Sequence, residues 1–314
     1  MYKGELIAIT VAVSWTACAM FAEVASKRLG SFGLNISRMI LSLVMLAVLM
    51  FCWTGQPCPM YADTETWLWL SLSGLVGYML GDYCLMNCYI LVGSRIGQLL
   101  MTLAPPAAAL TGLLLLGERM SLLAIVGMFV TLAGIALCLS GAKKQTITEP
   151  TDGSRLAKGV LLGVGAAMGQ GVGLVLSAKG LVCYTASLEA HGMLGTDVEM
   201  LIPFASTSMR AVTGLVGFSL WALLSGKLRE VRNVGHDVKG TLCMLAATIT
   251  GPFIGVSLSL MATLYTSTGI AQTIMATSPI LILAPSHFIF RQRITLREIA
   301  GAIISVVGVT LFFL

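Results

Sequence analysis

Long apolar runs separated by short polar segments dominate the pattern along this chain. Ten runs can be placed, and each has about the 20 residues that a helix needs to cross a ~30 Å hydrocarbon core. They cover residues 4–25, 32–53, 66–91, 95–116, 121–140, 158–179, 199–224, 239–265, 269–289 and 295–314. The pattern therefore predicts an all-α polytopic membrane protein with ten transmembrane helices.

The polar segments between the runs predict how the helices are grouped. The segment from Lys143 to Arg155 holds Pro150, Asp152 and Gly153, and it lies between two sets of five runs. We therefore predict a first five-helix unit over residues 1–141, a polar linker over 142–157 and a second unit over 158–314. The junctions at 92–94, 117–120 and 266–268 are only a few residues long, so the runs that they join are expected to form antiparallel hairpins.

An internal duplication supports this division. Residues 77–140 align without a gap on residues 251–314, and the matches are rich in Gly, Pro, Gln and Arg, which have backbone or polar roles. The twelve identities pair Gly77 with Gly251, Gly81 with Gly255, Ile96 with Ile270, Gln98 with Gln272, Met101 with Met275, Pro105 with Pro279, Arg119 with Arg293, Leu122 with Leu296, Ile125 with Ile299, Gly127 with Gly301, Gly134 with Gly308 and Leu137 with Leu311. Because five is odd, two sequential copies must enter the membrane from opposite sides, as an inverted repeat typical of transporters.

Composition narrows the class of protein. Apolar residues make up 57% of the 314 residues and charged residues only 11%, whereas soluble proteins are about 25% charged. The net charge of +5 therefore concerns topology and not nucleic acid. No nucleotide-binding loop, metalloprotease motif or nucleophile elbow is present, so the sequence predicts neither an enzyme nor an ATP-driven pump, and it implies no cofactor.

The distribution of Lys and Arg predicts the topology. Fourteen lie at the odd-numbered loops, three at the even-numbered loops and the N-terminal tail, and two within spans. Since cytoplasmic loops carry the excess of these residues, we expect the odd loops in the cytoplasm and both termini on the outer side of a cell (inner) membrane.

Asp82 is the leading candidate for a functional residue. It lies within the third span, more than one helical turn from either end. A carboxylate in hydrocarbon is costly, so such residues usually face a polar cavity and mark a substrate pathway or a proton relay. The alternative is a structural ion pair or helix cap, with Arg95 as one partner. The second copy has Val256 at the equivalent position.

Three further charged residues lie within the spans. Glu23 and Arg38 stand at comparable distances from the turn near Gly30 and are one predicted pair, although Glu23 can instead bind Lys27 at i+4. Arg210 corresponds to Arg38 in the other copy. We expect it to bind an anionic group or to neutralise a carboxylate such as Asp82.

Interrupted helices point to a central binding site. Pro105 and Pro279 break the fourth and ninth spans at equivalent positions, shortly after Gln98 and Gln272. Backbone groups freed by proline are tolerated in a membrane only where protein or a water-filled cavity satisfies them. Packing kinks are the alternative explanation.

Aromatic, glycine and cysteine residues add weaker predictions. Trp15 and Tyr78 could line the cavity or anchor at the membrane interface. The heptad-spaced glycines of the fifth and tenth spans indicate that these helices contact each other or form a homodimer with a second subunit. Cys84 and Cys88 share one helix face and, with 18 Met, leave a soft-metal carrier as an alternative.

These motifs resemble the drug/metabolite transporter superfamily, EamA type. The resemblance is carried by Ala104-Pro105-Pro106, Gly117-Glu118-Arg119, Gly127 and Gly134, and in the second copy by Ser278-Pro279, Arg293, Gly301 and Gly308. It implies two inverted five-helix halves around a central cavity and transport of a small metabolite, amino acid or drug, driven by a gradient or by exchange. In the second copy Arg291-Gln292 stands where the family has Gly-Glu.

The sequence therefore predicts a secondary active transporter, an exporter of a small-molecule substrate across the lipid bilayer, with H⁺ coupling through Asp82. A soft-metal or cation carrier is a second hypothesis. A membrane sensor or assembly subunit that does not transport is a third, and the paired broken helices argue against it.

Overall fold

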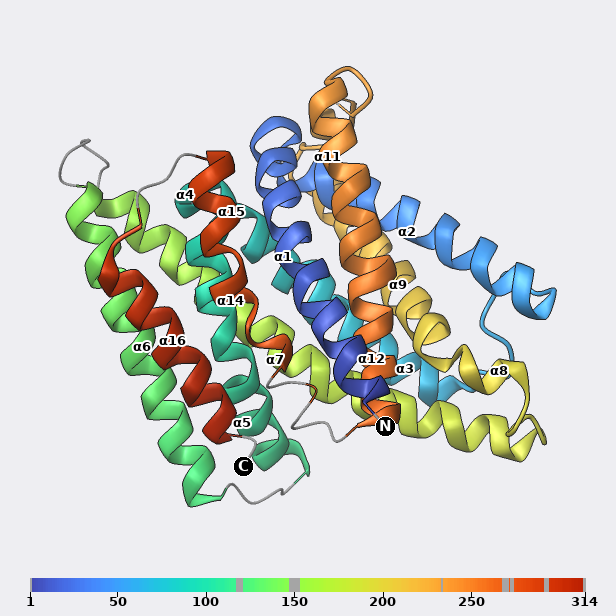
Figure 1. Cartoon of the computed structure of the whole chain (residues 1–314). Coiled ribbons are helices and arrows are strands. Elements are labelled where there is room, and N and C mark those ends of the chain that lie inside the picture. The colour runs from blue at the N-terminus through green and yellow to red at the C-terminus, as the bar shows by residue number, and fades with distance from the viewer. Residues whose placement is uncertain are drawn as a thin grey trace.

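The computed structural model describes residues 2–116, 121–146, 153–232, 234–266, 271, 274–290 and 294–312, and this part of the chain contains helices and no strands. The first half consists of α1 (Lys3–Leu29), α2 (Ser31–Thr54), α3 (Thr64–Ser73), η1 (Gly74–Asp82), α4 (Tyr83–Leu100), η2 (Met101–Leu103), α5 (Ala104–Leu116) and α6 (Leu122–Thr146). The second half consists of α7 (Gly153–Ala190), α8 (Asp197–Met200), α9 (Ile202–Leu224), α10 (Arg229–Arg232), α11 (Val238–Thr248), η3 (Ile249–Val256), α12 (Ser257–Tyr265), α14 (Ser278–Leu281), α15 (Leu283–Phe290) and α16 (Leu296–Phe312). The predicted all-α membrane fold is confirmed (Figure 1).

Seven helical runs in the described residues are long and apolar enough to cross a membrane. The run Thr64–Leu114 reverses direction at Gly93, whose φ of 84° no helix accommodates. Gln98 Nε2 donates to Tyr89 Oη at 2.8 Å, although nine residues of straight helix would separate the two positions by about 13 Å. The predicted hairpin at 92–94 is therefore present. The junction at 117–120 and most of the one at 266–268 lie outside the described residues, and the count of ten helices stays a prediction.

The third span has the same construction in both halves. Asp63 caps α3 by accepting from Thr66 N at 2.9 Å, and Asp237 caps α11 by accepting from Gly240 N at 2.9 Å. Each helix then widens into a π-helix, η1 or η3, at equivalent positions. π-Turns inside helices often occur at functional sites. The duplication therefore extends from sequence into an unusual local geometry.

The two halves pack on each other through these π-helices. η1 lies on α7, where its glycines approach Gly169 and Gly173, and η3 lies on α1 against Trp15 and Cys18. Ser73 Oγ also bonds Gly173 O at 2.7 Å. The third span of each half thus covers the first helix of the other, which places α1, α7 and both π-helices in the middle of the protein.

α6 and α16 also meet across the two halves. A Cβ added to Gly134 would meet Ser305 N, and one added to Gly308 would meet Thr131 N. Because the partner number falls as the residue number rises, the two helices are antiparallel, as expected for equivalent helices of inverted copies. The glycine faces are thus used within one chain. A homodimer through these helices remains a prediction, and it would need their other faces.

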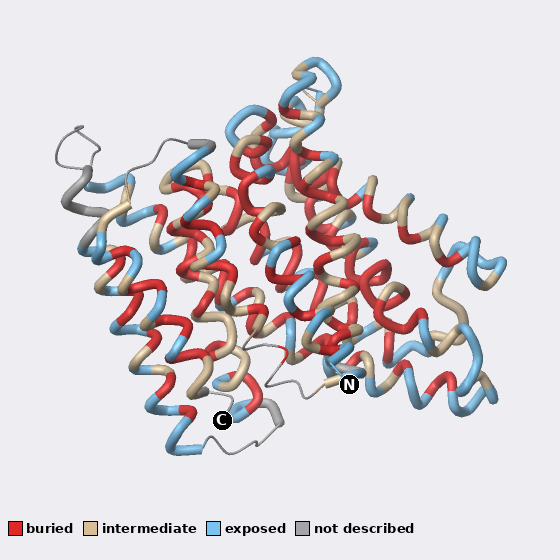
Figure 2. Tube along the Cα trace, in the orientation of Figure 1, coloured by how far each residue is buried: buried red, intermediate tan, exposed pale blue. Residues whose placement is uncertain are grey.

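Apolar side chains also cover the outer surface of the bundle. The buried residues follow the inner sides of the helices, while outer faces of α2, α6 and α9 are exposed (Figure 2). Leu114, Leu122 and Leu224 are each at least 80% exposed. An apolar surface of this extent fits contact with lipid.

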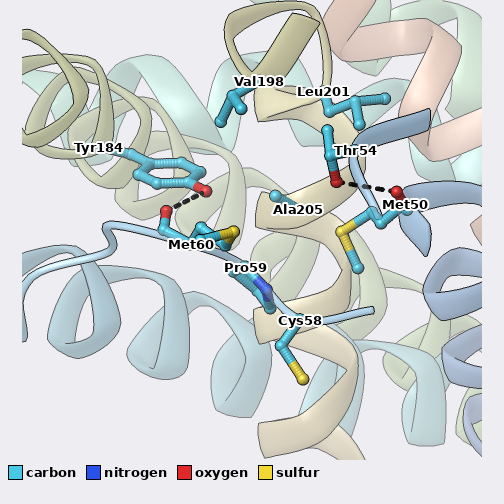
Figure 3. A pocket seen from close by; sticks show the side chains of 9 residues that line it. All are labelled: Met50, Thr54, Cys58, Pro59, Met60, Tyr184, Val198, Leu201 and Ala205. Carbon is cyan, nitrogen blue, oxygen red and sulfur yellow. Dashed lines mark hydrogen bonds between the residues drawn. The ribbon is translucent and has the colours of Figure 1, made fainter. Parts of the chain in front are cut away.

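α7 is longer than predicted, because it continues through residues 180–190. Tyr184 and Leu188 are buried there with Leu70 and Leu201, whereas the polar residues Thr185 and Glu189 lie on the exposed face. Tyr184 Oη donates to Met60 O at 2.9 Å and holds the loop after α2 beside a shallow pocket of about 20 Å³ (Figure 3). The pocket contains no charged side chain, and we assign it a structural role.

Candidate functional site

A central cavity of about 500 Å³ lies between the two halves. Its lining comes from α1, α2, η1, α4, η2 and α5 of the first half and from α7, α9, η3, α12, residues 275–276 and α14 of the second. Eight of the predicted residues contribute to it: Trp15, Arg38, Tyr78, Asp82, Gln98, Pro105, Arg210 and Pro279. Glu23 is not among the lining residues, and Gln272 lies outside the described residues. A cavity of this size is typical of small-molecule sites.

Asp82 is buried at the end of η1 and is held by two partners. Arg38 Nη2 forms an ion pair with Asp82 Oδ2, and Gln170 Nε2 donates to Asp82 Oδ1 at 2.8 Å. Arg95, the alternative partner that the sequence suggested for Asp82, instead binds Glu298 at 3.0 Å, on the far side of the Gly93 turn. The carboxylate is therefore paired across α2, η1 and α7, so that it joins both halves of the protein.

Gln170 is a cavity residue that sequence reasoning missed. It belongs to the glycine-rich face of α7, and its amide also donates to Gly77 O at 3.2 Å. That carbonyl belongs to η1, so Gln170 binds this π-helix through its backbone as well as through the Asp82 side chain. An amide in the middle of a glycine-rich apolar run was the signal that could have identified it.

Arg38 and Arg210 have different surroundings although they are equivalent in sequence. Arg38 binds Asp82, whereas Arg210 lies 4.5 Å from the centroid of the Tyr78 ring. Among the described residues, no ion pair and no side-chain hydrogen bond involves Arg210, and the Tyr78 hydroxyl is also without a partner. The ion pair with Asp82 is therefore formed by Arg38 and not by Arg210.

Glu23 has a structural position outside the cavity. It binds Lys27 at 2.6 Å, and its other oxygen accepts from Ser94 N at 2.6 Å. Of the two predicted pairings, the one with Lys27 forms and the one with Arg38 does not, because Arg38 points to Asp82. Glu23 thus caps the helix that starts after Gly93 and holds the hairpin turn beside α1.

The proline positions interrupt their helices as predicted. A 3₁₀ turn, η2, precedes Pro105, which is the second residue of α5. In the other half a turn at residues 276–277 precedes Pro279, the second residue of α14. Proline fits there because the first residues of a helix lack intrahelical partners for their N–H groups. Both breaks lie on the cavity.

The cysteines favour packing over metal binding. Cys84 and Cys88 face glycines of α7, and Cys88 is fully buried in an apolar cluster. In the described part of the chain, no three residues of the His, Cys, Asp and Glu types lie close enough together to hold a metal ion. Cys18 does line the cavity, beside the Asp82 pair.

Comparisons with known proteins agree with this architecture. A family model described as the EamA-like transporter family matches residues 2–140 and 157–314. No curated protein matches the chain. A solved structure titled "Crystal structure of protein" is similar with a TM-score of 0.55 at 16% identity, covering 99% of this chain and 96% of that chain. At this identity the likeness concerns the fold alone.

Proposed function

The chain belongs to the EamA-like transporter family, and we propose that it is a secondary active exporter that moves a small metabolite through the central cavity by alternating access. The observation that carries this proposal is the buried Asp82–Arg38 pair in the cavity wall. A buried ion pair is a poor stabilising device, since apolar residues of similar volume serve as well or better. Its position in a cavity between inverted halves favours a role in the transport cycle.

The pair supplies a way to couple substrate movement to a proton gradient. When Asp82 is ionised, it holds Arg38 on α2 and Gln170 on α7. A proton on Asp82 would remove the negative charge, so that Arg38 is released. Because these contacts join η1 to helices of both halves, protonation would change the relative stability of two arrangements of the halves.

The helix interruptions support movement of the same elements. η1 and η3 lie at equivalent positions, and both contribute to the cavity. Inverted repeats exchange conformations in alternating access, so that one half opens as the other closes. We propose that the two π-helices and the breaks before Pro105 and Pro279 take up this movement.

The test uses purified protein in liposomes that contain a pH-sensitive dye. A panel of amino acids, carboxylates, amines and drug-like cations is added on either side, with and without an imposed pH gradient. We expect one class of compound to move protons through the wild type and not through Asp82→Asn, and the side of addition reports the direction.

Asp63→Asn is the matched control, because Asp63 is an exposed helix cap far from the cavity lining and Asn is an equally good cap. We expect it to transport like the wild type. Normal proton-coupled flux in Asp82→Asn would refute the coupling role. Counterflow without proton movement in the wild type would identify an exchanger.

A further inference from the structure

The central cavity contains more positive than negative charge. The charged side chains in its described lining are Arg38, Asp82 and Arg210. Arg38 and Asp82 compensate each other as an ion pair, and each oxygen of Asp82 accepts one hydrogen bond, from Arg38 or from Gln170. The remaining charge is the guanidinium of Arg210, so the cavity lining has a net charge of +1.

Arg210 is held in place by its surroundings. The residue is 5% exposed. Its guanidinium lies over the Tyr78 ring, and its Nη2 would be 3.2 Å from a Cβ added to Gly77. Its Nε has no hydrogen-bond partner among the described residues. A cation–π contact offsets only part of the cost of removing a guanidinium from water, so an anion is the missing partner.

The duplication explains why this charge has no ion-pair partner among the described residues. In the first half Arg38 on α2 binds the carboxylate at position 82, in the π-helix of the same half. In the second half Arg210 on α9 is the equivalent arginine, but the equivalent of Asp82 is Val256, which also lines the cavity. The second half has thus kept the cation without its counterion.

We propose that Arg210 and the Tyr78 hydroxyl bind the carboxylate of a small monoanionic substrate. The planar guanidinium matches a carboxylate and forms paired, charge-assisted hydrogen bonds with it. The rest of the lining is largely apolar, with Leu85, Met101, Leu174 and Met275 among it, which favours a substrate with an apolar body. This inference rests on the proposed function, because it names the substrate class of the same cavity.

The arrangement favours a monocarboxylate over other ions. A zwitterion would bring an ammonium group that needs an uncompensated carboxylate, and the charge of Asp82 is already compensated by Arg38. A dianionic phosphate would exceed the single uncompensated charge. A cation would face the same-sign charge of Arg210 in a low-dielectric cavity.

The test measures binding to the full chain in lipid nanodiscs by calorimetry. The three probes are 3-phenylpropanoate, the neutral 3-phenylpropanamide and the cationic 3-phenylpropylamine, which differ mainly in charge, and empty nanodiscs correct for partition into lipid. We expect the carboxylate to bind at least about tenfold more tightly than the amide or the amine. Arg210→Gln should weaken carboxylate binding about 10- to 100-fold, as for loss of a hydrogen bond to a charged group, and leave amide binding unchanged.

Arg28→Gln is the matched control, because Arg28 pairs with Asp237 at the exposed end of α1 and does not line the cavity. Arg210→Lys keeps the charge without the planar pair of donors, so an intermediate affinity is expected and this variant serves if Arg210→Gln does not fold. Equal affinity for the three probes, no binding of any probe, or full carboxylate affinity in Arg210→Gln would overturn the inference. Tighter binding of phenylalanine than of 3-phenylpropanoate would also overturn it in favour of zwitterions.

Flux in liposomes separates this inference from the proposed function. Selective carboxylate binding without flux would leave the binding site intact and refute transport. Flux of the amine or the amide, with no preference for the carboxylate, would leave transport intact and refute the role assigned to Arg210.

Discussion

The two halves of this protein share a backbone and differ in charge. Both have an aspartate-capped third helix that widens into a π-helix, and both have a broken helix with proline on the cavity. Both also have an arginine at the equivalent place in their second helix. Only the first half has a carboxylate to bind that arginine, because Asp82 is replaced by Val256 in the second.

This difference indicates which features belong to the shared backbone architecture and which contact the substrate. A backbone architecture that alternates between two arrangements needs matching elements in its two halves, so backbone features are repeated. A substrate is not symmetric, so the side chains that contact it need not be repeated. We therefore expect the Asp82–Arg38 pair of the first half to couple transport to protons, and Arg210 of the second half to recognise the substrate.

The largest effect is expected from breaking the pair in the first half. Arg38→Met should destabilise the protein by about 3–5 kcal/mol, because it leaves the carboxylate of Asp82 buried without its cation. The double variant Arg38→Met/Asp82→Leu should recover most of this loss. Equilibrium unfolding in mixed micelles measures both. A double variant as unstable as the single one would show that the cost comes from packing and not from charge.

A second loss of stability, of about 1–3 kcal/mol, is expected at the contact between α6 and α16, where the two halves are alike. In Gly134→Ala the new Cβ would lie within 3.0 Å of the backbone of Ser305, and in Gly308→Ala it would lie within 3.0 Å of the backbone of Thr131. The two contacts are equivalent, because Thr131 corresponds to Ser305 as Gly134 corresponds to Gly308. The two variants should lose similar stability in the same unfolding assay. Gly153→Ala, with no described atom within 4 Å of the new Cβ, is the control. Unequal losses would mean that α6 and α16 do not meet symmetrically.

A third prediction removes the difference between the halves. Val256→Asp places a second carboxylate in the cavity lining, at the position equivalent to Asp82, so that the net charge of the lining falls from +1 to zero. We expect binding of 3-phenylpropanoate to weaken at least about tenfold, or about 1.4 kcal/mol, in the nanodisc titration. Val256→Asn, similar in size without the charge, should bind the probe more tightly than Val256→Asp. Equal binding by the two variants would contradict the inference about Arg210.

The smallest effect concerns the caps outside the membrane. Thr66, whose backbone N–H donates to the carboxylate, lowers the pKa of Asp63, and the Arg28 guanidinium together with Gly240 N lowers that of Asp237. A carboxyl with a lowered pKa in the folded state stabilises above its unfolded pKa of about 3.9 and loses this contribution as the pH falls through the folded value. The melting temperature should therefore decrease slightly from pH 5 to pH 3. It should depend less on pH in Asp63→Asn/Asp237→Asn, and an unchanged pH dependence would count against the caps.

Much of the site was predictable because position in a span restricts what a polar residue can do. Asp82, Arg210 and Pro279 were identified as polar or helix-breaking residues far from any span end, where only a cavity or another polar group can satisfy them. Glu23 met the same criterion, but it caps the helix that starts after Gly93. The position of a residue within a span does not reveal which residues of other helices lie beside it. Gln170 was missed because amides in glycine-rich runs are less conspicuous than charges.

The sequence by itself determined that the chain is a helical membrane protein with a duplicated plan, because the lengths of the apolar runs and the 174-residue repeat both follow directly from the order of residues along the chain. The tertiary structure alone decided the pairing of the charges. Arg38 and Asp82 are 44 residues apart, and Gln170 comes from the other half of the chain. Which partner a buried charge finds depends on how whole helices cross, and no local pattern encodes that crossing. For this reason Arg210, equivalent to Arg38 in sequence, lies in the cavity without an ion pair to any described carboxylate.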